Sequence, residues 1–231
     1  MKHPTLYIIH GWTYTTSHWE QTLDIMRSDG YPTVMLHVPG LTEPSTRTFT
    51  IDDYVKWARK NIPTGAIALG HSNGGRILMN LLAAHPDKLS HLILLSSAGI
   101  YEQSRKRDFV RTIAKLGAPL KRIPLFRKIF HKLTGASDYD AAPANMKVTL
   151  SNMLASDKNL HPENITTPTT ILWGEADTTT PLRQGQALHD RIQNSTIQTY
   201  KNWTHAPYIS DPAGLARALE TVVDTIEGGK K

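Results

Sequence analysis

A short apolar strand that runs directly into a helix constrains this chain more than any other feature. Residues 66–69 are apolar and lead into Gly70, and after Gly75 apolar residues recur at helical spacing. Between the two elements lies the pattern Gly70-x-Ser72-x-Gly74. Such an abrupt change forces the middle residue into an unfavourable backbone conformation, so the residues two positions away must be small. The pattern predicts a serine hydroxyl held at the strand end, beside the free N–H groups of a helix N-terminus.

Length and composition limit what the rest of the chain can be. The 231 residues are enough for one large α/β domain, and cysteine is absent, which excludes disulfides and thiolate metal sites. No N-terminal stretch has the basic, apolar and small-residue regions of a secretory signal, and no apolar run approaches the length of a membrane span. We therefore expect a cytoplasmic protein without stable membrane insertion.

Apolar strands and amphipathic helices alternate along most of the sequence. Continuous apolar strands that alternate with helices are typical of a parallel sheet covered on both faces. We expect an α/β fold with a mostly parallel sheet of about six strands, in which the functional site lies beyond the carboxyl ends of the strands. The expected strands are 6–9, 34–38, 66–69, 92–95, 171–173 and 196–201.

Two residues follow expected strands at that edge of the sheet. Asp177 comes after strand 171–173, and His205 comes after strand 196–201. A serine needs an imidazole to accept its proton, and that imidazole needs a carboxylate to hold its tautomer. Thr180 and the proline after it are expected to cap the next helix, so capping does not explain Asp177. Glu175 is the alternative acid.

This constellation resembles the α/β-hydrolase superfamily, whose nucleophile, acid and histidine occur in the same chain order. The resemblance extends from about residue 6 to residue 226, apart from an insertion in the middle. It implies a mostly parallel sheet covered by helices on both faces. It also implies that Ser72, Asp177 and His205 are the catalytic residues. It also implies that the reaction needs no cofactor.

A second motif carries the resemblance near the start of the chain. His10-Gly11-Trp12 follows the first expected strand and resembles the oxyanion loop of the superfamily. This implies that the backbone N–H groups of Trp12 and Asn73 are the oxyanion donors. We expect His10, Gly11 and His71 to contribute to substrate binding, although His71 and Asn73 could equally have packing roles.

Residues 101–163 interrupt the alternation where this superfamily inserts a helical cap. We expect a cap over 101–163 and a hydrolase core formed by 1–100 and 164–231. Between residues 104 and 132 there are ten Lys or Arg residues against one acid. These charges could form a solvated helix face, or could attract an anionic substrate or an anionic lipid surface. Binding of nucleic acid is the least favoured alternative, because no aromatic stacking platform accompanies the charges.

These patterns favour a serine hydrolase that acts on a small-molecule carboxylic ester or related acyl compound. The expected partner is that substrate alone, with no metal and no cofactor, and the chain is expected to be a monomer or a small homo-oligomer. The same triad chemistry also allows hydrolysis of amides or C–C bonds, acyl transfer and haloperoxidase activity. A receptor that keeps the fold and binds a ligand is the alternative from another class, although binding alone does not require a strained serine.

Overall fold

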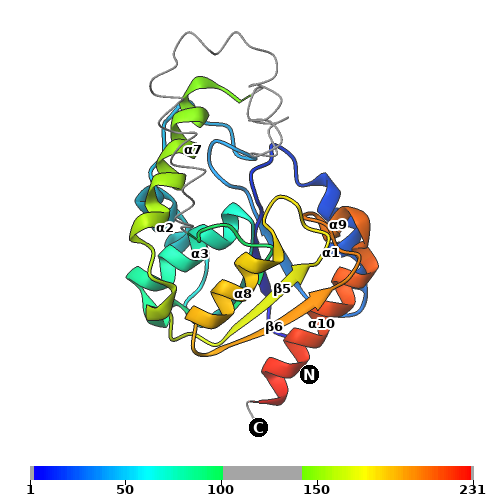
Figure 1. Ribbon diagram of the computed structural model, residues 1–231. Helices are drawn as coiled ribbons and strands as arrows, with labels where there is room; N and C mark the ends of the chain where they lie inside the picture. The colour runs from blue at the N-terminus through cyan, green and yellow to red at the C-terminus, as the bar shows by residue number, and fades with distance from the viewer. Residues whose placement is uncertain (1–2, 101–141, 230–231) are drawn as a thin grey trace.

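The computed structural model describes residues 3–100 and 142–229, which contain a six-stranded parallel sheet between helices (Figure 1). The strand order is β2-β1-β3-β4-β5-β6, and every neighbouring pair is parallel. The predicted α/β class and the predicted number of strands are confirmed. The strands are β1 (Leu6–Ile9), β2 (Thr33–Leu36), β3 (Ala66–His71), β4 (Leu89–Leu95), β5 (Thr169–Gly174) and β6 (Ser195–Tyr200).

Helices connect the strands and cover the sheet. The α-helices of the described chain are α1 (Glu20–Ser28), α2 (Ile51–Asn61), α3 (Asn73–Ala84), α7 (Ala144–Ser156), α8 (Leu182–Arg191), α9 (Pro207–Ser210) and α10 (Pro212–Gly228). Short 3₁₀ turns occur at η1 (Ser17–Trp19), η2 (Pro86–Lys88), η4 (Asp157–Asn159) and η5 (Pro162–Asn164). No helix among these residues is long and apolar enough to cross a membrane.

The core consists of two apolar clusters, one on each face of the sheet. Helices α2, α3 and α8 pack on one face, and α1 and α10 pack on the other (Figure 1). Side chains of a strand alternate between the two faces, so Ala68 belongs to the first cluster whereas Ile67 and Leu69 belong to the second. Leu94 and Leu95 divide in the same way. Burial on both faces explains why these strands are apolar without interruption.

The second strand ends earlier than its apolar pattern predicts. The expected strand 34–38 includes Val38, but β2 ends at Leu36. The carbonyl oxygen of Val38 accepts hydrogen bonds from the N–H groups of Leu41 (3.0 Å) and Glu43 (3.1 Å). Its own N–H donates to the Thr42 hydroxyl. These bonds form a turn, and a residue whose backbone groups are used in a turn cannot also pair along a sheet.

Helix α7 is the longest element in residues 142–163, the part of the expected cap that the structure describes. Asn145 Nδ2 donates to the carbonyl oxygens of Ser45 and Arg47, and the N–H of Phe49 donates to the Thr149 hydroxyl (3.0 Å). Helix α7 is therefore held against the loop between β2 and α2 by direct hydrogen bonds. Residues 101–141, with the basic segment between 104 and 132, lie outside the described chain, so the cap stays a prediction.

Candidate active site

Ser72 occupies a strained turn between β3 and α3. Its backbone has φ 51° and ψ −116°, a left-handed conformation that is unfavourable for any residue with a Cβ. A Cβ on Gly70 would lie 2.5 Å from the Gly75 backbone, and one on Gly74 would lie 2.0 Å from the Ile9 carbonyl oxygen. The close packing of strand, turn and helix therefore requires both glycines of the sequence pattern, and the predicted backbone strain is confirmed.

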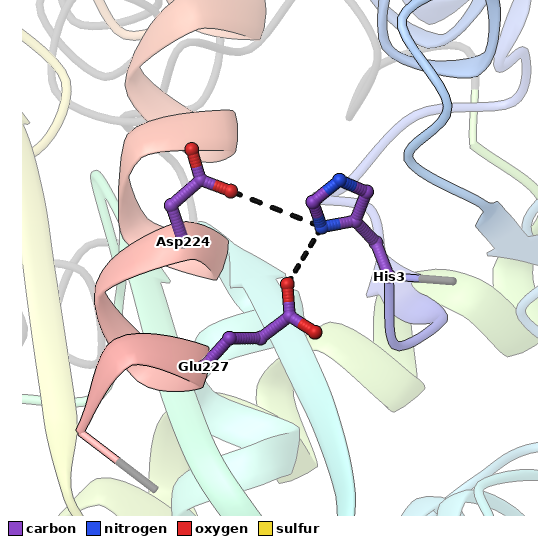
Figure 2. A group of neighbouring side chains, drawn as sticks. All are labelled: His3, Asp224 and Glu227. Atoms are coloured by element: carbon purple, nitrogen blue, oxygen red, sulfur yellow. Dashed lines mark hydrogen bonds and ion pairs between the residues drawn. The ribbon is translucent and has the colours of Figure 1, made fainter. Parts of the chain in front are cut away.

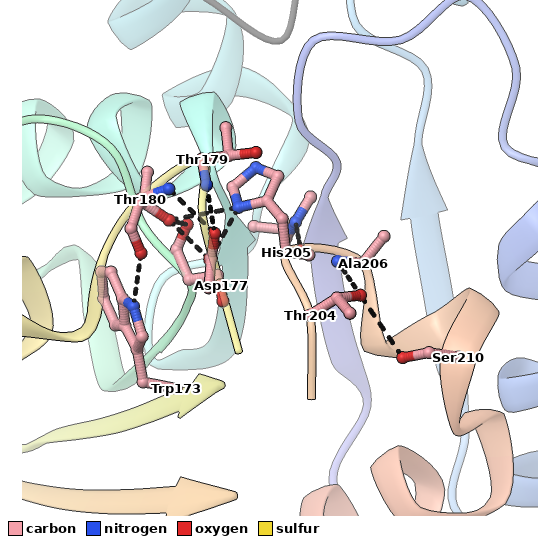
Figure 3. A network of polar contacts seen from close by, with 10 residues as sticks. Trp173, Asp177, Thr179, Thr180, Thr204, His205, Ala206 and Ser210 are labelled. Carbon is pink, nitrogen blue, oxygen red and sulfur yellow. Dashed lines mark hydrogen bonds and ion pairs between the residues drawn. The ribbon is translucent and has the colours of Figure 1, made fainter. Parts of the chain in front are cut away.

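Asp177 and His205 meet in the loops that follow β5 and β6. The imidazole Nδ1 of His205 lies 2.9 Å from Asp177 Oδ2 and donates a hydrogen bond to it (Figure 3). The carboxylate is fully buried, whereas the His205 side chain is 23% exposed. Because Nδ1 carries the proton, Nε2 is left with a lone pair that can accept one.

The Asp177 carboxylate receives three further hydrogen bonds from its own loop. The backbone N–H groups of Thr179 (2.8 Å) and Thr180 (2.9 Å) donate to Oδ1, and the Thr180 hydroxyl donates to Oδ2 (2.8 Å; Figure 3). Burial raises the pKa of Asp177, but the hydrogen bonds from His205 and Thr180 and the charge of His205 outweigh it, so the pKa lies below the usual value. The group is thus held as an anion that orients the imidazole.

The prediction that Thr180 caps the helix after this loop is wrong. Thr180 was expected to cap α8, but that helix begins after Pro181 without a side-chain cap, and the Thr180 hydroxyl binds Asp177 instead. Asp177 therefore organises the turn and orients His205 at once. The alternative acid, Glu175, is exposed and accepts a hydrogen bond from the Thr199 hydroxyl (3.1 Å).

The loop of His205 is joined to the turn of Ser72 through His71, the last residue of β3. His71 Nε2 donates to the carbonyl oxygen of His205 (2.8 Å), and the two ring centroids are 4.9 Å apart. Among the described residues, no hydrogen bond joins the Ser72 hydroxyl to the His205 ring. Catalytic hydrogen bonds are often long without substrate and shorten when it binds. The structure thus pairs Asp177 with His205 and places Ser72 directly after His71, the residue that contacts the His205 loop.

His71 is buried among aromatic rings. Trp19 and Tyr208 pack edge-on against it, with ring centroids at 5.9 Å and 5.2 Å. Burial, together with the nearby charge of His205, lowers the pKa of His71 to about 3. The ring is therefore neutral at physiological pH, with its proton on Nε2, and its buried Nδ1 has no hydrogen-bond partner. These contacts support a structural role, and the assignment of His71 to substrate binding stays a prediction.

The loop after β1 packs directly against the serine turn. His10 Nδ1 donates to the carbonyl oxygen of Gly11 (2.8 Å), and the Thr42 hydroxyl donates to His10 Nε2 (2.8 Å). Both His10 nitrogens are therefore occupied, and burial lowers the pKa of His10 to about 4. A trans peptide points its C=O and N–H in opposite directions, so fixing the Gly11 carbonyl also fixes the N–H of Trp12. A Cβ on Gly11 would lie 3.0 Å from Ser72 Cβ.

Two buried charges next to the site are not predicted from the sequence. Arg76, on α3, pairs with Asp157, at the start of η4, and both side chains are almost fully buried. Arg76 also donates to the side-chain oxygen of Asn73. The only available signal was a charged residue within the otherwise uncharged helix α3. Its partner lies 81 residues further along the chain, where local spacing carries no information.

A third group of ionisable side chains lies away from the site. His3 Nδ1 is 2.6 Å from Glu227 Oε2 and 3.8 Å from Asp224 Oδ1, both on α10 (Figure 2). Tyr31 stacks on the His3 ring and donates to Asp224 (2.9 Å). His3, Asp224 and Glu227 have the chemistry of a metal-binding group. Local spacing in the sequence does not indicate it, because the residues come from opposite ends of the chain. Their protein contacts account for the arrangement.

The sequence model of the alpha/beta hydrolase fold matches residues 4–212. The chain belongs to this family. It is similar to a pimeloyl-[acyl-carrier protein] methyl ester esterase of Neisseria meningitidis serogroup B, with 25% identity over 97% of this chain and 93% of the relative. The enzyme of the same name from Chromobacterium violaceum is 22% identical over 96% of this chain and 95% of its own length.

Solved structures of hydrolases share the fold. A putative lipase from Acinetobacter baumannii superposes with a TM-score of 0.74 at 19% identity, over 98% of this chain and 85% of the lipase. A thermophilic esterase from Thermogutta terrifontis superposes with a TM-score of 0.71 at 16% identity, over 96% of this chain and 90% of the esterase. These structures show the fold alone. The family assignment and the esterase relatives make the protein a carboxylesterase-type hydrolase of this family.

Proposed function

We propose that Ser72, His205 and Asp177 form the catalytic triad of this esterase. The proposal is supported by a histidine–aspartate pair at 2.9 Å in the loops after β5 and β6, at the same edge of the sheet as a serine with a left-handed backbone (φ 51°) after β3. No packing requirement of the sheet calls for a strained serine there, whereas a nucleophile held in a tight turn between a strand and a helix does. The chain order of the three residues is also that of the family.

In the first half of the reaction, an acyl-enzyme forms. His205 Nε2 takes the Ser72 hydroxyl proton while Ser72 Oγ bonds to the ester carbonyl carbon, and the carbonyl oxygen becomes an anion. When this intermediate collapses, the bond to the alcohol oxygen breaks and the alcohol leaves with the proton from His205. Asp177 stabilises the positive imidazole throughout and stays ionised.

In the second half, water releases the acid. His205 takes a proton from the water molecule as its oxygen attacks the acyl carbon, and a second oxyanion forms. Collapse of this intermediate breaks the bond to Ser72 Oγ, which regains its proton from His205. The products are one alcohol and one carboxylic acid, and the enzyme returns to its starting state.

The backbone N–H groups of Trp12 and Asn73 serve as the oxyanion donors in this mechanism. Asn73 is the first residue of α3, where N–H groups have no partner within the helix and the helix dipole favours negative charge. The contact from His10 to the Gly11 carbonyl supports a fixed direction for the N–H of Trp12. Preorganised donors of this kind need no rearrangement as charge develops.

The substrate is an acyl ester, and we propose a methyl ester of a carrier-bound dicarboxylic acyl chain as the first candidate. This rests on the names of the relatives from Neisseria meningitidis and Chromobacterium violaceum. We further propose that residues 101–163 form the cap over the acyl chain, since α7 is anchored to the loop between β2 and α2 beside the core. A cytoplasmic location stays the expectation from the sequence.

Labelling with a fluorophosphonate probe tests the triad. The probe reacts with activated serines, so the wild-type protein should be labelled and Ser72→Ala should not. Ser28→Ala, at an exposed serine on α1, is the control that should keep full labelling. Labelling that persists in Ser72→Ala would contradict the proposal. The candidate substrate is tested separately, by comparing hydrolysis of methyl pimelate on an acyl-carrier protein with a panel of p-nitrophenyl esters of increasing acyl length.

A further inference from the structure

A buried ion pair joins the helix of the proposed nucleophile to the segment that follows α7. Arg76 Nε lies 2.6 Å from Asp157 Oδ1, and Arg76 Nη2 lies 3.0 Å from Asp157 Oδ2. The two parallel hydrogen bonds fix the plane of the guanidinium. Arg76 and Asp157 are each 3% exposed, so the pair is almost completely removed from water.

The third hydrogen bond of Arg76 goes to the residue directly after the proposed nucleophile. Its Nη1 donates to the side-chain oxygen of Asn73. A guanidinium has only donors, so it can bind the oxygen of an amide but not its NH₂ group. Arg76 therefore determines which end of the Asn73 amide faces it. The planar guanidinium thus connects Asp157 with Asn73.

The position of Asn73 makes this orientation important. An asparagine side-chain oxygen readily accepts hydrogen bonds from nearby backbone N–H groups. At the start of α3 the N–H groups of Gly75 and Arg76 already donate to the Ser72 carbonyl oxygen, which leaves those of Asn73 and Gly74 without a partner in the helix. At the start of α3, however, no side chain caps these groups. The Asn73 oxygen is bound to Arg76 instead. An amide oxygen on these N–H groups would compete with an oxyanion for the same donors.

Stability alone does not require the charges of Arg76 and Asp157. Removing two charges from water costs several kcal/mol, and replacing a buried ion pair with apolar side chains is often neutral or stabilising. A pair of apolar residues would fill the same space between α3 and η4, but it would not bind the Asn73 oxygen. The bond to the Asn73 oxygen is thus one effect of the ion pair that an apolar pair would not reproduce.

We propose that Arg76 and Asp157 are positioning residues for the oxyanion site. They hold the Asn73 side-chain oxygen away from the backbone N–H groups beside Ser72, so that these groups stay available to the substrate carbonyl. The inference rests on the proposed function, because it assigns a purpose to an oxyanion donor. It also links the oxyanion site to the segment that returns from the expected cap.

The test is a double-mutant cycle on kcat, with the thermal midpoint measured on the same samples. Arg76→Met/Asp157→Leu removes both charges together and leaves no buried ion unpaired. We expect about a tenfold loss of kcat, smaller than the 10²–10³ that follows removal of a whole oxyanion donor. KM and the thermal midpoint should change little. In the Asn73→Ala background, which lacks the competing oxygen, the same substitutions should change kcat less than twofold.

If the double variant does not fold, Arg76→Lys gives the same comparison. Lysine keeps a cation next to Asp157, but it lacks the planar guanidinium that donates hydrogen bonds to Asp157 and Asn73 together. An unchanged kcat in the folded variant, or an equal loss in the Asn73→Ala background, would overturn the inference. Failure of the proposed function is distinguishable, because it would appear as labelling that does not depend on Ser72.

Discussion

His71 and His205 are joined by a hydrogen bond from the His71 imidazole Nε2 to the backbone carbonyl oxygen of His205, 2.8 Å long. This bond connects the last residue of β3 with the loop after β6, 134 residues further along the chain. The proposed nucleophile, Ser72, directly follows β3, and the loop carries the proposed base. The contact holds the backbone of the base, whereas Asp177 holds its ring. The relative position of Ser72 and His205 thus depends on a side chain that takes no part in proton transfer.

Substitution of His71 should lower the turnover number. His71→Phe keeps the aromatic contacts with Trp19 and Tyr208 but removes the donor to the His205 carbonyl. We expect kcat to fall about tenfold, because small displacements of a catalytic group can reduce rates by that factor or more. His71→Gln retains an N–H donor and is the matched control, which should keep most of the activity. Equal losses in both variants would show that the hydrogen bond is not the cause.

Gly11→Ala should strongly reduce activity. The added Cβ would lie 2.8 Å from His71 Nδ1 and 3.0 Å from Ser72 Cβ, so the loop after β1 or the serine turn must move. Steady-state kinetics should show a fall in kcat of about 100-fold, since one displaced oxyanion donor costs that much. Gly228→Ala, at a glycine of α10 with no atom near the new Cβ, should leave kcat unchanged. A fully active Gly11→Ala protein would contradict the close packing of the two loops.

The fold should lose stability in mild acid because two buried histidines are held neutral. Burial lowers the pKa of His10 to about 4 and that of His71 to about 3, from 6.5. Between those values and pH 6.5, the unfolded chain binds protons that the folded chain does not. Stability is therefore complete above pH 6.5 and falls as the pH decreases, by about 1.4 kcal/mol per pH unit for each ring.

Urea unfolding between pH 7.5 and 4.5 checks this expectation. His71→Gln removes one of the two titrating groups, so its free energy of unfolding should fall less steeply with decreasing pH than that of the wild type. His18→Gln changes an exposed histidine and should leave the slope as it is. A slope that is equally steep in His71→Gln would mean that His71 does not contribute.

Thr180→Val should weaken, without abolishing, the hydrogen bonding that orients Asp177, the carboxylate of the proposed triad. The substitution removes the hydroxyl that donates to Asp177 Oδ2, while the N–H groups of Thr179 and residue 180 still donate to Oδ1. We expect a three- to tenfold loss of kcat, roughly 1 kcal/mol, as for one hydrogen bond to a charged group. Thr180→Ser keeps the hydroxyl and should retain activity. A normal kcat in Thr180→Val would assign the orientation of Asp177 to the backbone donors alone.

The architecture was predictable because the inner strands β1, β3, β4 and β5 are largely buried on both faces and therefore contain apolar runs that alternate with amphipathic helices. The edge strands β2 and β6 are partly exposed and give a weaker pattern. The exact ends were less predictable, since the turn around Val38 depends on the Thr42 hydroxyl and on carbonyl contacts that a periodic pattern does not contain. The apolar pattern of a strand indicates which side chains are buried. It does not indicate where the backbone stops pairing with the neighbouring strand.

The candidate site was predictable only in part. The pairing of Asp177 with His205 was predictable because the carboxyl ends of parallel strands meet at one edge. The hydrogen-bond partners of Thr180, His71 and Arg76 were not predictable, since each depends on a side-chain orientation or on a residue far away in the chain. A glycine pattern or a residue after a strand is a local signal. A hydrogen bond between distant segments exists only once the chain has folded.

The left-handed backbone at Ser72 is needed for the proposed activity but lowers the thermal stability of the protein. A serine held at φ 51° costs on the order of 1–3 kcal/mol, and glycine would adopt the same conformation freely. Ser72→Gly should thus give an inert protein that withstands heat better than the active one. A screen of variants for thermal stability alone would therefore favour loss of the hydroxyl. Such a screen must also measure the turnover of each variant.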